Sequence, residues 1–165
     1  MKNAIEAMQS RRSIRTYNTG LTVERSTIEE IVDCARLAPT AMNDQPWEFV
    51  VVTEKLSLAK IPTLLGHAEF IANAAFCVLV FTRESGCALE DCCAATENLL
   101  IAAESHGLGA CWVAGANQSY APAVAQAFGA PASHRLISLV SVGHPAEQPT
   151  IEKRPLAEVL HWERF

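Results

Sequence analysis

Hydrophobic and polar positions along the chain follow two kinds of spacing, one helical and one strand-like. Between residues 26 and 39 the apolar positions recur with the period of a helix, and Pro39 ends the run. These positions are Ile28, Ile31, Val32, Ala35 and Leu37. Ser26 and Glu29 fit a capping box, so the sequence predicts a helix that begins at Ser26 and stops before Pro39.

Two short segments are also predicted to be helical. Residues 2–10 place Ile5 and Met8 on one face, as expected for a helix that buries an apolar stripe. Residues 122–128 begin with a proline and are followed by a glycine, which is the arrangement that helix ends favour.

The longest predicted helix covers residues 89–106 and closes at Gly107. Its apolar residues cover more than one stripe, so nearly the whole circumference should be packed, and a second copy of the chain is the expected second wall. Residues 56–73 have a mixed pattern, which Pro62 and Gly66 are expected to divide into two short helices.

Four segments have the β-branched and aromatic content of strands. They are residues 47–52, 76–81, 110–114 and 136–142. Strands and helices are mixed along the chain, which predicts helices layered about a central sheet. We expect one domain over residues 1–165, with a polar tail from residue 146 that becomes amphipathic at 155–160.

Composition favours a soluble protein that associates with itself. Hydrophobic residues make up 50% of the chain and charged residues 19%, below the roughly 25% usual for soluble domains, so one copy has surplus apolar surface. No apolar run approaches the roughly 18 residues that span a bilayer, and no secretion signal opens the chain, so we expect a cytoplasmic location and no membrane. The net charge of −5 argues against nucleic acid as a partner.

The six cysteines show no pattern that predicts chemistry. They lack C-x-x-C spacing and a nearby histidine, so we expect small buried side chains in a reducing compartment and no metal site. Cys92 and Cys93 are adjacent, but neighbours on a helix point about 100° apart, which disfavours a disulfide.

The segment from Arg11 to Arg15 carries three guanidinium groups and a hydroxyl within five residues. Guanidinium pairs bidentately with phosphate or carboxylate and stays protonated, so the segment is a candidate anion clamp. A solvated basic turn after the first helix explains the same residues.

The usual motifs of protein-borne catalysis are missing: the chain has no G-x-S-x-G, H-E-x-x-H, Walker loop or G-x-G-x-x-G. Polar side chains gather instead at irregular positions, among them Thr40, Asn43, Gln45, Lys153 and Arg154. Such a distribution is typical of a protein that orients a cofactor carrying the reactive atom. The alternative for Asn43 and Gln45 is that they satisfy the backbone of a turn.

Five motifs in register together carry a resemblance that spans nearly the whole chain. They are Arg11-Arg12-Ser13-Ile14-Arg15, the stretch from Ala38 to Trp47, the helix from Glu90 to Leu100, Gly107-Leu108-Gly109-Ala110-Cys111-Trp112, and the tail from Lys153 to Val159. In this order they resemble the FMN-dependent nitroreductase family. The resemblance implies an α+β fold, a three-layer α/β/α sandwich around a mostly antiparallel sheet. It also implies a homodimer with FMN at the subunit interface.

Site residues follow from the same resemblance. Arg11, Ser13 and Arg15 would hold the phosphate and the pyrimidine side of the flavin, while Arg12 would be structural. A second group would reach the flavin from the other subunit, namely Pro39, Thr40, Ala41 and Asn43, with Gln45 supporting their loop. Backbone groups of Trp112, Val113, Ala114 and Gly115 would line one face of the ring. Lys153 and Arg154 would complete the phosphate site, and because they are adjacent, one of the two is expected to touch phosphate.

The implied reaction is ping-pong hydride transfer from NADH or NADPH to FMN and on to a small organic acceptor, such as a nitroaromatic or a quinone. No catalytic side chain is expected, because the flavin carries the chemistry and solvent can supply protons. The alternatives are a flavin-binding, storage or sensor module without turnover and, last, a thiol redox protein at Cys92 and Cys93. The acceptor, the nicotinamide preference and the residue of 56–73 that touches the flavin stay open, with Asn73 and His67 as candidates for the last.

Overall fold

A computed structural model describes all residues, 1–165. Its helices are α1 (Ala4–Ser10), α2 (Arg25–Arg36), α3 (Lys55–Leu65), α4 (Ala88–Ser105) and α5 (Ala121–Ala127). Its strands are β1 (Trp47–Val52), β2 (Phe76–Arg83), β3 (Gly109–Ala114) and β4 (His134–Gly143). Three short 3-10 helices cover Ala41–Asn43, Glu69–Asn73 and Leu156–Glu158. None of the helices combines the length and the apolar content needed to cross a bilayer.

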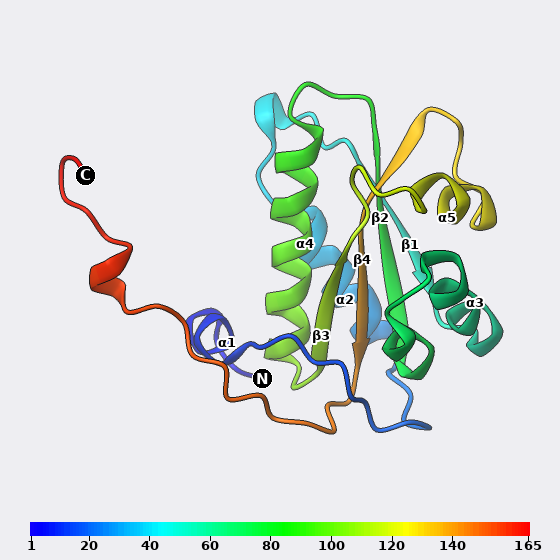
Figure 1. Cartoon of the computed structure of the whole chain (residues 1–165), viewed down its shortest axis with the longest axis horizontal. Helices are drawn as coiled ribbons and strands as arrows, with labels where there is room; N and C mark the ends of the chain where they lie inside the picture. Colours follow the sequence, from blue (N-terminus) through cyan, green and yellow to red (C-terminus); the bar gives the residue numbers. More distant parts are fainter.

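The four strands form one antiparallel sheet in the order β1-β2-β4-β3. Helices α2 and α4 cover one face and α3 and α5 the other, so the α/β/α sandwich is confirmed (Figure 1). The central strand β2 is buried from Phe76 to Thr82, which explains its continuous apolar run. Strand β3 lies at an edge, and its outer backbone groups are therefore available to other segments.

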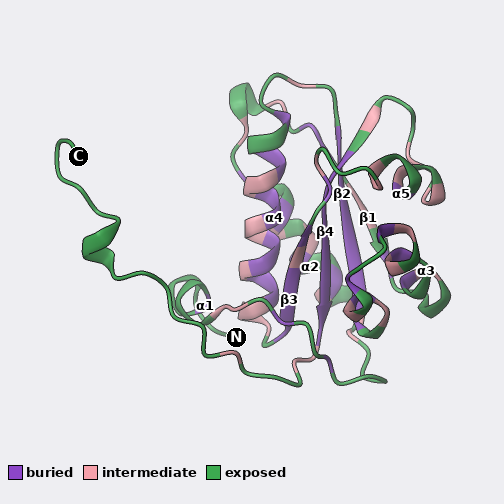
Figure 2. Ribbon diagram, in the orientation of Figure 1, coloured by how far each residue is buried: buried purple, intermediate pink, exposed green.

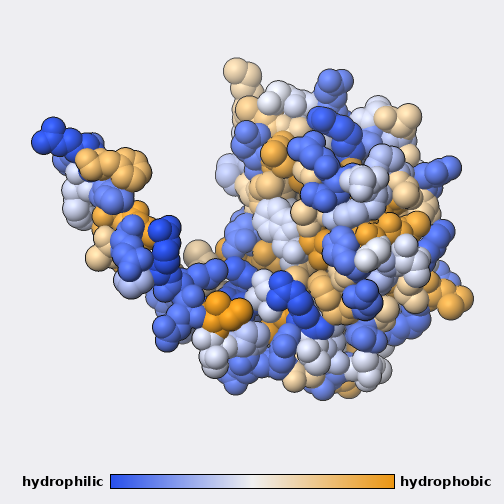
Figure 3. All heavy atoms as spheres, in the orientation of Figure 1, coloured by the Kyte–Doolittle hydropathy of each residue, from blue (hydrophilic) through white to orange (hydrophobic).

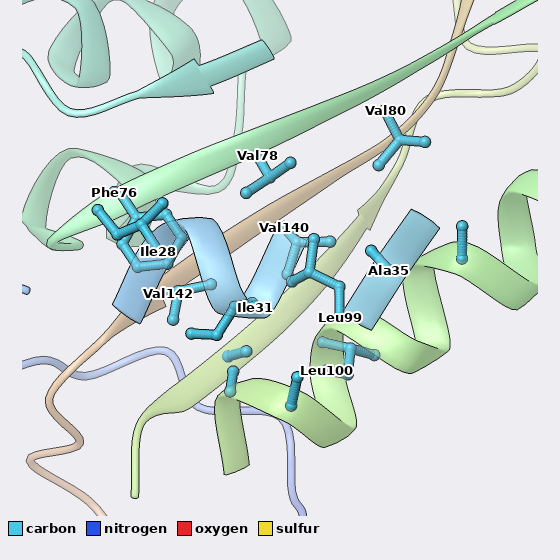
Figure 4. Packing of buried hydrophobic residues seen from close by; sticks show 14 of the residues in the cluster. Ile28, Ile31, Ala35, Phe76, Val78, Val80, Leu99, Leu100, Val140 and Val142 are labelled. Carbon is cyan, nitrogen blue, oxygen red and sulfur yellow. The ribbon is translucent and has the colours of Figure 1, made fainter. Parts of the chain in front are cut away.

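Two apolar clusters fill the spaces between the layers. On one face Ile31 of α2 and Leu99 of α4 are fully buried against Val78 and Val140 of the sheet (Figure 4). On the other face Leu58 and other buried residues of α3 join β2 and α5. Full burial of such a side chain contributes roughly 1.5–3 kcal/mol, so these clusters supply most of the driving force for folding.

The expected start of the second helix is wrong. Helix α2 begins at Arg25, with Glu24 as its cap and no side-chain hydrogen bond at that cap. Ser26 already lies within the first turn. A serine caps the free N–H groups from the position just before the helix, so Ser26 cannot be the cap. The structure contains a capping box elsewhere, at Asn3 and Glu6 of α1.

The expected break at Pro62 is also wrong, because α3 continues through it. Proline removes one backbone hydrogen bond, but Leu58, Ile61 and Leu65 bury one face of the helix on the sheet and hold it together. Gly66 ends the helix as expected, in a left-handed conformation with φ of 74°.

Much of the apolar surface of the N- and C-terminal segments is exposed in a single chain. Ile5 and Met8, which the pattern placed on one face of α1, are 64% and 53% exposed. After residue 151 the tail runs away from the body, and all of its residues are exposed (Figures 1 and 2). Apolar side chains occur along this tail and nothing in the chain covers them (Figure 3): Ile151, Leu156, Val159, Leu160, Trp162 and Phe165.

Candidate functional site

The arginine segment lies along the open edge of β3. Ser13 forms a parallel bridge with Ala110, and the Ile14 N–H donates to the Ala110 carbonyl at 2.9 Å. Gly109 permits this contact, because a Cβ there would lie 2.7 Å from the Ile14 side chain. The segment is therefore extended, and successive side chains point to opposite sides.

Arg11, Ser13 and Arg15 share one side of this segment. All three act on the buried thiol of Cys111: burial raises its pKa, while Arg15, Arg11 and the Ser13 hydroxyl lower it. Arg12 points elsewhere and donates to the Ile151 carbonyl at 3.2 Å and to backbone carbonyls of the first helix end. The structure thus brings together the residues of the expected clamp and gives Arg12 a structural contact.

The clamp guanidiniums have weak partners or none among the acidic side chains. Arg11 Nε lies 3.6 Å from Glu97 Oε1, and the Glu97 side chain is 46% exposed. Arg15 has no carboxylate partner and its guanidinium lies 5.9 Å from the centre of the Phe70 ring. Exposed ion pairs contribute roughly 0–1 kcal/mol, so an incoming anion can compete for Arg11.

Beside the clamp, the edge of β3 offers backbone groups. The Ala110 carbonyl is taken by Ile14, and the Ala114 carbonyl accepts from the Tyr120 hydroxyl. By the two-residue alternation of a strand, the backbone of Trp112 faces the same edge. Its side chain packs against the cluster under α4, so Trp112 can serve this edge through its backbone alone.

The next residues turn sharply against β4. The N–H groups of Gly115 and Ala116 both donate to the Ile137 carbonyl, at 2.9 and 3.0 Å. A Cβ at Gly115 would lie 2.7 Å from Leu136 Cγ, so only glycine fits. Val113 and Gly115 are both buried, and the Gly115 carbonyl accepts from the Gln118 N–H, so Trp112 and Ala114 are the more accessible residues of this predicted ring-binding stretch.

The second predicted group forms a tight loop at the N-terminal end of α4. Met42, Asn43 and Gln45 have φ of 52°, 59° and 50°, a left-handed conformation that is uncommon without glycine. The loop is held from inside, since the Gln45 N–H donates to Thr40 Oγ1 at 3.2 Å and Gln45 Nε2 donates to the Asn43 carbonyl at 3.1 Å. Pro39 is exposed at its start. These hydrogen bonds of Gln45 fit both expectations for it, namely that it supports the loop and that it satisfies the backbone of a turn.

Two residues outside the predicted set fix the loop from outside. Asp91 of α4 accepts from the Ala41 N–H at 3.1 Å, and Arg83 of β2 pairs with Asp44. Asp91 is 5% exposed and its second oxygen, Oδ2, has no hydrogen-bond partner in the chain. The sequence offered one signal for Asp91: it is an acidic residue on a face of α4 that is otherwise buried.

The clamp and the loop lie on different sides of α4. Asp91, which holds Ala41, and Glu97, which pairs with Arg11, are six residues apart, so about 9 Å along the axis and about 120° around it. One chain therefore does not bring the loop to the clamp. Lys153 and Arg154 are exposed in the tail, two and three residues beyond the contact of Ile151 with Arg12.

Among residues 56–73, the structure separates the two candidates for a flavin contact. The His67 ring is 5.4 Å from the Tyr120 ring, and the Tyr120 hydroxyl donates to the Ala114 carbonyl, so His67 lies near the end of β3. Phe70 lies under Arg15. Asn73 ends the 3-10 helix at Glu69–Asn73 and makes no such contact, so His67 is the better placed candidate.

All six cysteines are free, and Cys77, Cys92 and Cys111 are buried as expected, whereas Cys87 is exposed. Burial raises the pKa of Cys92 to about 11 and raises that of Cys77 further. Cys93 is half-buried and its pKa is also raised, mainly by burial. Thiolate is the reactive form, so these environments oppose thiol redox chemistry at the adjacent pair.

The fold and the site together define a class of protein: a three-layer sandwich with an anion clamp beside an open sheet edge. The model of the nitroreductase family matches residues 8–64 and 57–144, and the chain belongs to this family. A protein of Methanothermobacter thermautotrophicus, whose name describes an NADH dehydrogenase/NAD(P)H nitroreductase, is 32% identical over 169 residues, which cover 99% of this chain and 88% of the relative.

Two further comparisons extend this finding. The NADPH-flavin oxidoreductase of Vibrio harveyi is 25% identical over 183 residues, which cover 100% of this chain and 75% of the relative. A crystal structure from Bacteroides thetaiotaomicron, also titled as an NADH dehydrogenase/NAD(P)H nitroreductase, superimposes with a TM-score of 0.92 at 28% identity, with both chains covered completely.

Proposed function

We propose that this chain is an FMN-dependent oxidoreductase that transfers hydride from NADH or NADPH to flavin and passes electrons, in ping-pong order, to a small organic acceptor. The observation that carries the proposal is the common side of Arg11, Ser13 and Arg15 beside the open edge of β3. Membership of the nitroreductase family and the names of the relatives support the reaction class.

The residues present fit FMN. A phosphate dianion requires more than one cation to offset its dehydration, and each charge-assisted bond contributes roughly 1.5–3 kcal/mol. The Arg15 guanidinium forms no ion pair, because Glu147 accepts only from the Arg15 backbone N–H, and Arg11 is held loosely by Glu97, so both guanidiniums can turn to phosphate. The backbone of Trp112 offers donors and acceptors to the polar edge of a flat ring, and His67 is our candidate for its pyrimidine side.

When bound, FMN supplies the ring atom that accepts and returns hydride. The protein would bind the flavin and orient it. Arg11, Ser13 and Arg15 hold the anionic end, and the backbone from Trp112 to Gly115 sets the position of the ring edge. No side chain of the chain is assigned a proton transfer, which solvent can perform.

We further propose a homodimer whose two sites are each built from both copies. The loop holding Pro39, Thr40, Ala41 and Asn43 cannot reach the clamp of its own chain, whereas a two-fold arrangement about α4 would offer it to the clamp of a partner. The exposed apolar residues of α1 and the tail support such a partner surface.

Residues 1–165 then act as one domain whose tail, from residue 146, completes the cofactor site or the dimer. The Arg12 contact with Ile151 starts the tail close to the clamp, so one of Lys153 and Arg154 would be the additional phosphate ligand. A cytoplasmic location is part of this proposal, and six free cysteines fit a reducing compartment.

The test is a visible spectrum of the purified protein, followed by NADH or NADPH without oxygen. We expect a yellow protein that either nicotinamide bleaches, with colour returning when an acceptor is added. A colourless protein that takes up no added FMN would refute the proposal. A yellow protein that neither nicotinamide bleaches would be a flavin-binding module without turnover.

A further inference from the structure

A second concave site lies between α5 and the start of β4, away from the arginine segment. It has a volume of about 580 Å³. Small-molecule sites in proteins typically have about 300–1,000 Å³, so the cleft is large enough for an organic ligand. Its floor is apolar, formed by Ala121, Ala125 and Leu136, and one wall carries the side-chain amides of Gln118 and Gln126.

The charge of the cleft differs from that of the whole protein. Two basic side chains, His134 and Arg135, line it and no acidic residue does, although the chain has a net charge of −5. Arg135 is exposed and has no carboxylate partner, whereas Arg83 on the neighbouring strand is occupied by Asp44. A cation left unpaired above an apolar floor suits an anionic ligand with a flat apolar body.

His134 adds a second donor. The Ser133 hydroxyl lies 3.2 Å from His134 Nδ1, so the other ring nitrogen, Nε2, is left for the cleft. Nε2 donates both in the imidazolium and in the neutral tautomer that accepts from Ser133. The cleft is therefore lined by Arg135 as the donor for an oxyanion, by His134 as a separate donor from the neighbouring position of β4, and by amides that can pair with the edge of a heterocycle.

The cleft lies close to the proposed flavin site. A smaller cavity of about 160 Å³ shares Asn117, Arg135 and Leu136 with it and extends to Ala116. Ala116 and Gly115 are both bonded to the carbonyl of Ile137, two residues after Arg135 on β4. A ligand in the cleft would therefore lie along the same strand that holds the ring-binding backbone.

We propose that this cleft binds a phosphorylated nucleoside, with Arg135 on the phosphate, His134 on another polar group of the ligand, and the floor at Ala121, Ala125 and Leu136 under the base. Two sources share this chemistry: the phosphorylated adenosine half of NADPH and a free nucleotide bound as a separate ligand. The first source rests on the proposed function, because it would make Arg135 a residue that selects NADPH over NADH.

The binding test uses adenosine 2′,5′-bisphosphate as the probe and the full chain loaded with FMN, measured by calorimetry. We expect Arg135→Gln to weaken probe binding at least about tenfold, as for loss of a charge-assisted phosphate contact. Lys60→Ala is the matched control, because Lys60 is an exposed cation of α3 outside the cleft, and it should bind like wild type. A wild-type protein that does not bind at millimolar probe, or an Arg135→Gln variant that binds equally well, would overturn the proposal.

The second arm separates the two sources. If the cleft receives NADPH, Arg135→Gln raises the KM for NADPH about tenfold, leaves the KM for NADH unchanged and leaves flavin content unchanged. If the cleft receives a free nucleotide, probe binding falls in the variant while both KM values stay the same. The calorimetric arm does not require turnover, so it tests the cleft even if the protein reduces nothing with NAD(P)H.

Discussion

Neighbouring residues of the same type have different contacts in this protein. Arg11, Arg12 and Arg15 are close in sequence, yet Arg12 donates to backbone carbonyls while the other two face Cys111 and the open side of the segment. The cause is the extended backbone, which sends alternate side chains to opposite sides. The pairing of the segment with Ala110 therefore decides which arginines are free for an anion.

We expect Arg11→Ala and Arg15→Ala each to weaken FMN binding at least about tenfold, because each removes a charge-assisted phosphate contact. A fluorescence titration with FMN measures the loss, and circular dichroism checks the fold. Arg36→Ala is the control, because it removes the same charge from an exposed position on α2 where the arginine pairs only with Asp33, and it should bind FMN like wild type. Wild-type affinity in both clamp variants would show that the anion binds elsewhere.

Asp91→Ala should free the loop at Ala41 and destabilise the protein by about 1–3 kcal/mol, because the buried Ala41 bond has no replacement. Amide exchange at Ala41 should rise, and FMN should bind more weakly in the dimer. Asp91→Asn keeps an acceptor at the position of Oδ1 and removes a buried charge whose Oδ2 has no partner, so it should be as stable as wild type. If amide exchange at Ala41 is unchanged in Asp91→Ala, contacts within the loop are sufficient to fix its conformation.

At the scale of elements, the chain after β4 returns alongside the arginine segment. Tyr17 bridges Pro145, the Ala146 N–H donates to the Thr16 carbonyl, and the Glu147 carboxylate accepts from the N–H groups of Arg15 and Thr16. These contacts tie the start of the tail to the back of the clamp, so the position of the clamp depends on both ends of the chain.

Glu147 makes this tie sensitive to acid. Its pKa lies below the ordinary 4.5, because the backbone N–H groups of Arg15 and Thr16 favour the carboxylate. A lowered folded-state pKa means that the contribution to stability is present above 4.5 and is lost as the pH falls toward the folded value. The protection factors of the Arg15 and Thr16 amides against exchange should therefore fall below about pH 4.5.

Glu147→Gln is the matched variant, since it keeps the acceptor oxygen and the size of the side chain. At neutral pH the amides of Arg15 and Thr16 should be less protected from exchange than in wild type. Their protection factors, which compare the rate with that of an unprotected amide at the same pH, should be nearly constant between pH 3 and 6, a range set by ordinary carboxyl pKa values of about 4. An equal loss of protection with acid in both proteins would place the responsible carboxylate elsewhere.

At the scale of the whole molecule, the core and the functional surfaces are separate. The two clusters that hold the sheet contain no residue after Val142, and residues 150–165 are all exposed. The apolar side chains of this tail and of α1 therefore contribute little to the stability of one chain. Their burial requires a partner, which is the physical argument for the dimer.

Removal of residues 151–165 should leave the fold intact and abolish both the dimer and tight FMN binding. Light scattering at micromolar protein and a flavin titration measure the two losses. In the full chain, Lys153→Ala and Arg154→Ala should differ, with the larger loss of FMN affinity at the residue that touches phosphate. A flavin-loaded monomer, truncated or full-length, would contradict the shared site.

The sequence by itself determined what depends on local spacing and on the identity of single residues. Helical and strand periods predicted α1, α2, α4, α5 and the four strands, but divided α3 at Pro62. Glycines marked the ends at Gly66 and Gly107, and the motif order predicted the family. Two local readings were wrong, at Ser26 and Pro62, because the start of a helix and the tolerance of a proline depend on how the helix packs.

Only the tertiary structure decided which distant residues share a site. Asp91 holds Ala41 across 50 positions, Glu147 meets Arg15 across 132, and His67 approaches β3 through Tyr120. Such contacts leave no periodic pattern, since they arise when the layers pack and bring together surfaces that are remote in the chain. The same holds for the arginine segment, which is evident in the sequence as a cluster of charge. Its pairing with β3 in the folded chain separates Arg11 and Arg15, which face the open side, from Arg12, which makes structural contacts.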